Sequence, residues 1–324
     1  MPAPTLRELF ELKKTGPHTY ETLLPPERMG NSANIAYGGC ALAVGVHAAC
    51  QDVPPSYRLY SALGSYLGPA LTDRTLLCRV RALRNTRTFA TRLVEVSQTQ
   101  DNGSERACMV FLADFQLPEK ASLLVYSKPP TTLPIHWRHC QTNDEVHRRL
   151  VAEGVISEEM LKESDELFGM SRRFLEVRSV PGNLLAETLK GAAKDAPTAQ
   201  EHLRIYDKSS SDWVRQKHRC ETYAEQVSAL AWISDMAVAF IPLMHNHMYF
   251  DDASACSSLE FALRVFKNDI DAEAWMMREF KTTAAGEGRT YSESQFWDEE
   301  GNMIASMTQQ SILRPAKGRK TQKL

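Results

Sequence analysis

The sequence predicts an α+β protein in which one unit occurs twice, each copy a long apolar helix wrapped by a curved antiparallel sheet. Each half of the chain holds one long apolar helical segment followed by several strand-like segments joined by short turns. Equivalent features also recur at a near-constant distance. Gly103 and Gly301 are 198 residues apart, and Pro118 and Pro315 are 197 apart. A constant offset across turn and terminal proline indicates two copies of one fold.

In the first half, an apolar helix is expected over residues 37–50, beginning at Gly38-Gly39. Strands are expected at 76–83, 88–98 and 106–116. The last two are joined by Gln-Asp-Asn-Gly at 100–103, which is a strong hairpin signal.

In the second half, the apolar helix is expected at 229–240. Strands are expected at 259–266, 274–282, 289–297 and 303–313. A helix that is apolar nearly all round must be covered on most of its sides. A curved antiparallel sheet can do this, and the arrangement is known as the hotdog fold. The sequence therefore predicts a double hotdog.

Four segments follow from this division. They are the first copy at 1–117, a linker at 118–171, the second copy at 172–316 and a basic, disordered tail at 317–324. The linker opens with a proline-rich loop, and polar helices are expected near 143–153 and 157–168. We expect the linker to pack on the outside of the molecule.

Composition excludes several classes of partner. The net charge is −2, so no basic field for nucleic acid is expected. Residues 227–244 form an 18-residue apolar run, the lower limit for a membrane span. Asp235 near its centre favours a buried helix, and no membrane span is expected.

The cysteines and the first residues indicate a reducing compartment. The seven cysteines contain no C-x-x-C pair, and residues 1–14 mix acidic and basic side chains without an apolar core. Gln322-Lys323-Leu324 is similar to the S-K-L peroxisomal address, with Gln in place of the usual small residue. A plain solvated tail is the alternative. We therefore expect an intracellular protein, cytoplasmic or peroxisomal.

Asp235 is the most informative residue of the chain. A buried carboxylate without partners is strongly unfavourable, so Asp235 needs polar neighbours. The pairs Ser257-Ser258 and Gln309-Gln310 lie in later strands and can supply them, and alternation places only one of each pair on the inner face. Asp, Ser and Gln around an apolar channel suggest a site that activates water. The alternative is that Asp235 caps or staples the core through backbone N–H groups.

Several short motifs resemble one family. They are Ala-Tyr-Gly-Gly at 36–39, Ser-Tyr-Leu-Gly-Pro at 65–69, Arg-Asn-Thr-Arg-Thr-Phe at 84–89, Ile-Ser-Asp at 233–235, Ser-Leu at 258–259 and Ser-Met-Thr-Gln at 306–309. In this order and spacing, the chain resembles the type II acyl-CoA thioesterases, double-hotdog enzymes that hydrolyse fatty acyl-CoA.

The resemblance implies an acyl-CoA substrate and three catalytic residues, Asp235, Ser258 and Gln309. Asp235 would act as general base, while the other two would orient the water. A weaker implication is substrate binding by Gly38, Gly39 and Arg87. No cofactor or metal is implied. A homo-oligomer is expected, because hotdog sheets commonly pair edge to edge or back to back.

The sequence departs from the family pattern in two places. Glu260-Phe261 stands where the family usually has Asp-His, and Lys267 follows Phe266 in place of a histidine. These positions are outside the proposed trio, so they leave substrate preference and subunit contacts open. Gln309 is expected to fall opposite Leu112 or Ala113 of the first copy, so the trio would come from the second copy alone.

Other functions remain as alternatives. A hotdog acyltransferase would pass the acyl group to an amine or alcohol, and a non-catalytic protein would only bind acyl-CoA. Hotdog hydratases place a histidine five residues after the aspartate, where this chain has Phe240. His245 and His247 with two nearby aspartates match no strong metal pattern. Cys40, near a helix start, is either a plain buried thiol or one with a lowered pKa.

Overall fold

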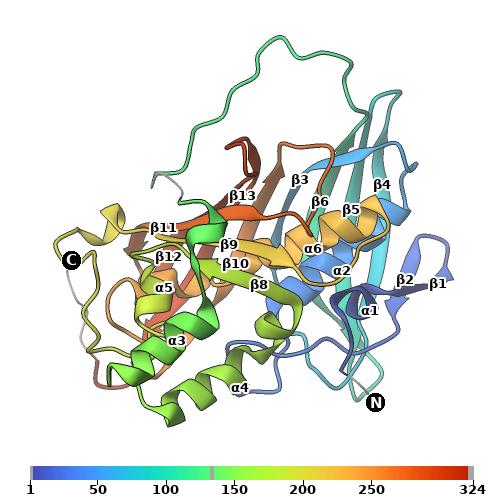
Figure 1. Cartoon of the computed structure of the whole chain (residues 1–324). Coiled ribbons are helices and arrows are strands. Elements are labelled where there is room, and N and C mark those ends of the chain that lie inside the picture. The colour runs from blue at the N-terminus through green and yellow to red at the C-terminus, as the bar shows by residue number, and fades with distance from the viewer. Residues whose placement is uncertain (1–2, 132–134, 320–324) are drawn as a thin grey trace.

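The computed structural model describes residues 3–131 and 135–319. Within this part of the chain, the strands form one 13-stranded sheet that curves around two long helices (Figure 1). From its middle outward, one side runs β3-β6-β5-β4-β2-β1 and the other β10-β13-β12-β11-β9-β8-β7. The two sides thus repeat one strand order, and β3 pairs antiparallel with β10 where they meet. The predicted double hotdog is confirmed.

The first copy contains two helices and six strands. They are α1 (Leu6–Phe10), β1 (Leu12–Gly16), β2 (Thr19–Thr22), α2 (Gly38–Gln51), β3 (Arg58–Tyr66), β4 (Leu77–Asn85), β5 (Phe89–Thr99) and β6 (Glu105–Gln116). The expected helix, the three strands and the hairpin turn at Gly103 are all present.

The second copy repeats the central part of this order. Its elements are β8 (Leu175–Ser179), α5 (Leu184–Glu187), the 3-10 helix η2 (Ile205–Asp207), β9 (Ser210–Gln216), α6 (Tyr223–Asp235), the 3-10 helix η3 (Val238–Phe240), α7 (Ile241–Met244), the 3-10 helix η4 (Phe250–Asp252), β10 (Ala253–Val265), β11 (Met276–Gly286), β12 (Arg289–Trp297) and β13 (Met303–Pro315). The connection from the long helix to the next strand is longer here than in the first copy.

The expected boundaries of the second long helix, 229–240, are wrong. Helix α6 begins at Tyr223, where Thr222 and Glu225 form a capping box, and it ends at Asp235. The chain then turns through Ala237, whose φ of 71° is left-handed. Asp235 is therefore the last residue of the helix, not a residue in its middle.

Helices α2 and α6 pack antiparallel in the centre of the molecule (Figure 1). At one end, the Tyr37 hydroxyl donates to the Trp232 carbonyl oxygen at 2.8 Å. At the other end, the Leu59 N–H donates to the Tyr223 hydroxyl at 2.8 Å. The start of α2 therefore meets the end of α6, and the start of α6 meets the chain just after the end of α2.

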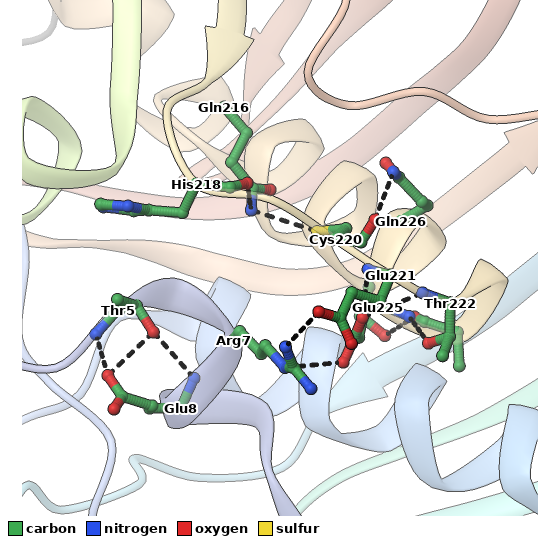
Figure 2. Close-up of polar contacts among 12 residues, drawn as sticks. Thr5, Arg7, Glu8, Gln216, His218, Cys220, Glu221, Thr222, Glu225 and Gln226 are labelled. Atoms are coloured by element: carbon green, nitrogen blue, oxygen red, sulfur yellow. Dashed lines mark hydrogen bonds and ion pairs between the residues drawn. The ribbon is translucent and has the colours of Figure 1, made fainter.

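The N-terminal helix α1 closes the second of these ends. Figure 2 shows its capping box, in which the Thr5 side chain accepts from the Glu8 N–H and the Glu8 carboxylate accepts from Thr5. Arg7 of α1 pairs with Glu225 in the first turn of α6, with Nε 2.9 Å from a carboxylate oxygen. At the start of α6, the N–H groups of Thr222 and Glu225 donate to side chains of the protein itself.

The linker is more than an outer spacer. It contains the 3-10 helix η1 (Trp137–His139), β7 (Gln141–Thr142), α3 (Asn143–Ala152) and α4 (Glu158–Phe174). The two expected helices are present, but α4 crosses the expected boundary at residue 171. Its last part joins the main core, where Phe168 and Phe174 are buried. The expectation that the linker packs only on the outside is wrong for α4.

One segment of the described chain, Tyr223–Met244, is long and apolar enough to cross a membrane by length and composition, with a mean hydropathy of 1.7. Of its most apolar window, 83% is buried inside the protein. The core helix of a soluble protein has the same properties, and here the helix is interrupted after Asp235. The tripeptide Gln322-Lys323-Leu324 lies outside the described residues, so the address signal stays a prediction.

Candidate active site

A cavity of about 1150 Å³ opens between the two copies where α2 begins and α6 ends. Its walls come from the loop before α2, the end of β3, the segment after α6, the start of β10, the inner face of β8, β9 and β11, and helix α4. Gly38, Tyr66, Asp235 and Ser258 all line it. Asp235 and Ser258 therefore face a common space, whereas Gln309 is buried behind the wall of the cavity.

Asp235 is held against the start of α2. It is 6% exposed, and its Oδ2 lies 3.2 Å from where a Cβ would stand on Gly38. A Cβ on Gly39 would lie 2.4 Å from a ring carbon of Tyr37. The two glycines thus permit a close approach that larger residues would block.

A chain of hydrogen bonds links the three candidate residues. Ser258 Oγ donates to Gln309 Oε1 at 3.0 Å. Gln309 Nε2 in turn donates to Asp235 Oδ1. Tyr66, at the end of β3, donates its hydroxyl to the same Oδ1 at 2.7 Å. Because the Gln309 amide bridges its two neighbours, Ser258 acts on the carboxylate through Gln309.

Burial raises the pKa of Asp235 above its usual value. Hydrogen bonds from Tyr66, from Gln309 and from the Gly39 backbone N–H act in the opposite direction. The Gly39 N–H belongs to the first turn of α2, where helix N–H groups lack partners in the helix and the helix dipole favours negative charge. The N-cap residue Tyr37 makes no side-chain capping hydrogen bond, and the first turn holds no acidic residue.

The structure separates the adjacent alternatives. Gln309 is fully buried, whereas Gln310 is exposed. Ser258 reaches Gln309, whereas Ser257 is exposed. Ser258 bonds to the Gln309 amide, and that amide contacts Asp235, so the three residues are neighbours. Their chemical roles stay a prediction.

Not every candidate residue is brought to the site. Arg87 is exposed in the turn between β4 and β5, and it does not line the cavity. Its backbone carbonyl accepts from the Tyr57 hydroxyl, beyond the end of α2 and away from Gly38. Cys40 is buried, and burial raises its pKa to about 12, so it is a plain buried thiol rather than an activated one. In the described residues, no group of three or more His, Cys, Asp or Glu side chains could hold a metal ion.

The first copy has no equivalent of the polar chain. Gln309 is eight residues after Gly301, and Phe111 is eight residues after Gly103. The strand registers of the two copies agree with this spacing. Gln309 pairs with Ser292 of β12 in the second copy, and Phe111 pairs with Val94 of β5 in the first. The counterpart of Gln309 is therefore Phe111, and the expectation of Leu112 or Ala113 is wrong by one or two residues.

Phe261 lies at one of the positions where the sequence departs from the family pattern, and it belongs to the same apolar region as Phe111. Its ring packs edge-on against Tyr66 at 5.6 Å and against Phe111 at 5.9 Å between centroids. Its neighbour Glu260 accepts from the Gln310 N–H at 3.2 Å, and Lys267 pairs with Asp298 at 2.7 Å. These residues pack or pair within the protein.

Sequence reasoning missed two groups of site residues. Tyr66 stands in a quoted motif, yet its contact with Asp235 depends on how the two copies meet. Arg278 and Asp212 form a buried ion pair that lines the cavity. A charged residue inside the apolar segment Met276-Met277-Arg278-Glu279-Phe280 was the available signal, of the same kind as that at Asp235.

Residues 25–116 match the acyl-CoA thioesterase N-terminal domain, and residues 180–313 match the acyl-CoA thioesterase C-terminal domain. The two matches fall on the two copies and together cover more than half of the chain. The chain therefore belongs to the acyl-CoA thioesterase family and is a thioester hydrolase. No curated protein sequence matches this chain.

Solved structures show the same fold over almost the whole length. Acyl-CoA thioesterase II TesB2 from Mycobacterium marinum has 17% identity and a TM-score of 0.65, covering 97% of this chain and 99% of that one. The tesB protein MAP1729c of Mycobacterium avium subs paratuberculosis has 15% identity and a TM-score of 0.67, covering 96% and 100%. A hot dog fold protein from Alicyclobacillus acidocaldarius has 12% identity and a TM-score of 0.66, covering 96% and 98%.

Proposed function

We propose that this enzyme hydrolyses acyl-CoA to a free acid and CoA, with Asp235 as the general base. The observation that carries the proposal is the hydrogen-bonded chain from Ser258 through Gln309 to Asp235 on the wall of the cavity. A carboxylate with fixed polar neighbours beside a cavity is suited to hold a water molecule and accept its proton.

The proposed reaction needs no covalent intermediate on the enzyme. Water attacks the thioester carbonyl carbon while its proton passes to Asp235. The carbonyl oxygen becomes an oxyanion, which a backbone N–H in the first turn of α2 can stabilise. The carbon–sulfur bond then breaks, the CoA thiolate leaves and takes the proton from Asp235, and the acid is released.

The raised pKa of Asp235 suits this role. A carboxylate with a pKa above the ordinary value is a stronger base, yet it remains ionised at a pH above that pKa. Activity should therefore rise as the pH increases through this pKa.

The direct test is CoA release from acyl-CoA by Asp235→Asn. We expect kcat to fall by about 10² to 10⁴, which is the usual contribution of a general base. Ser258→Ala and Gln309→Ala should cause smaller losses. The matched control is Gln310→Ala, which alters the exposed neighbour of Gln309 outside the cavity and should retain activity. Full activity in Asp235→Asn would rule out the mechanism.

A further inference from the structure

A buried ion pair lines the cavity away from the proposed trio. Arg278 of β11 and Asp212 of β9 pair directly in the strand register. They are 2% and 4% exposed, and the guanidinium makes two bonds to the carboxylate, of 2.9 and 2.8 Å. Replacing such a pair with apolar residues is often neutral or stabilising, so stability does not account for it.

One nitrogen of the Arg278 guanidinium makes no bond to the Asp212 carboxylate. Nη1 is buried and has no hydrogen-bond partner among residues 3–131 and 135–319. An unpaired buried donor is costly, and most buried polar groups avoid it. Arg278 lines the same cavity as Asp235.

Lys190 is a second donor on the cavity wall. It has a left-handed φ of 57° in a turn that begins at Leu189, whose φ is 48°. Its Nζ lies 4.8 Å from the centre of the Phe168 ring, and the structure records no ion pair or hydrogen bond for it within the described chain. Burial lowers the pKa of this ammonium group to about 8. Nearby Lys194, by contrast, pairs with Asp251 and Asp252.

The two donors line the same cavity. We call the part of its wall formed by Ser179, Asn183, Asp212, Arg278 and Lys190 the inner lobe; the first four are buried, and Lys190 is half-buried. The loop at 32–35 and Leu67 line another side of the cavity and are largely exposed. The nucleotide of CoA is large and charged, so it would remain near the exposed side and leave the inner lobe for the acyl group.

We infer that the inner lobe selects acyl groups that carry an oxygen acceptor, above all a carboxylate, which binds Lys190 and Arg278 Nη1. This inference rests on the proposed function and adds the class of acyl group. A plain alkyl chain would bury both donors without partners, whereas a carboxylate gives each one a charge-assisted hydrogen bond. The Asp212 carboxylate already neutralises Arg278, so the charge of Lys190 is the one left for an anionic ligand.

The test compares CoA release from three series of acyl-CoA of matched length, ending in methyl, hydroxyl or carboxylate. The measured quantity is the ratio of kcat/KM for the carboxylate chain to that for the methyl chain. We expect this ratio to exceed one in the wild type at the best chain length and to fall by about 10-fold to 100-fold in Lys190→Met. Lys190→Arg should restore part of it, because it keeps the charge.

Lys194→Met is the matched control, since Lys194 is close in sequence but does not line the cavity. Its ratio should equal that of the wild type, and a thermal melt of each variant verifies folding. An unchanged ratio in folded Lys190→Met overturns the inference. An equal loss for all three series also overturns it, because Lys190 would then contact CoA itself. If the wild type releases no CoA from any series, the proposed function fails instead.

Discussion

The two ends of the α2 and α6 pair are built from similar elements but are completed differently. At one end, α6 begins with a capping box of Thr222 and Glu225, and Arg7 covers the carboxylate (Figure 2). At the other end, α2 begins without a side-chain cap, and Asp235 of the partner helix stands against its first turn. The first helix start is closed by the protein itself, and the second faces the cavity.

The difference shows that the two ends of one helix pair can be completed in different ways within a duplicated fold. The first N–H groups of any helix lack partners within the helix. Side chains that satisfy them stabilise the helix, but they also remove the donors from any ligand. Equivalent positions in the sheet also differ between the two copies. Gln309 of the second copy contacts Asp235, whereas the first copy has the packed ring of Phe111 at this position. At one end a side-chain cap stabilises α6, and at the other the first turn of α2 lies beside Asp235 at the cavity.

The largest effect in this comparison is expected from Gly39→Ala at the open end. The new Cβ would lie 2.4 Å from the Tyr37 ring, so this ring or the start of α2 beside Asp235 must shift. A displacement of about 1 Å can cost about 100-fold in rate, and we expect a loss of that order in kcat/KM. The control is Gly169→Ala on α4, where a Cβ meets nothing within 4 Å of the described structure. Equal activity of both variants would contradict the role given to the open end.

A smaller effect is expected from removing one tyrosine hydroxyl at each end. Tyr66→Phe removes a donor that lowers the pKa of Asp235, so this pKa should rise further. Because the base must be ionised, the acidic limb of the kcat/KM profile should move to higher pH. The loss at low pH should then exceed the loss at pH 8. Tyr223→Phe removes the matching hydroxyl at the closed end and should leave the limb in place.

The pH–rate profile decides this prediction. If the acidic limb moves equally in both tyrosine variants, the shift is not specific to Asp235. If it stays in place for Tyr66→Phe, the hydroxyl does not set the pKa of the catalytic base.

The smallest effect on activity is expected at the closed end. Thr222→Ala removes the cap of α6 and should lower the free energy of unfolding by about 1 kcal/mol, the usual cost of a lost N-cap. The change in kcat should stay below about twofold, because the cap lies at the opposite end of α6 from Asp235. Chemical denaturation and CoA release at 25 °C measure the two effects. A large fall in kcat without a fall in stability would contradict this prediction, because the closed end would then affect catalysis.

Several elements could be read from the sequence because their signals are local. The apolar helix at Gly38, the strand alternation and the hairpin turns at Gly103 and Gly301 all depend on residues close together in the chain. The start of α6 carried a local signal too, the Thr222 and Glu225 capping box, which predicts a helix start six residues before the expected one.

The candidate site was predictable only in part. Asp235 drew attention because a charge inside an apolar run needs partners, and the strands limited those partners to one of two serines and one of two glutamines. Which one faces inward depends on strand register, which pairing between distant strands fixes. Nothing in the sequence indicated which distant residues Tyr66 and Arg278 would contact.

The sequence by itself determined the two copies, their order of helix and strands, and the presence of an aspartate that burial would make reactive. Only the tertiary structure decided that Asp235 ends its helix, that Gln309 and Tyr66 share its Oδ1, and that Lys190 and Arg278 line the cavity. The physical reason is that periodicity and turn chemistry act between neighbours along the chain. The position of a side chain in a cavity is set instead by how separate elements pack, and no short stretch of sequence contains that information.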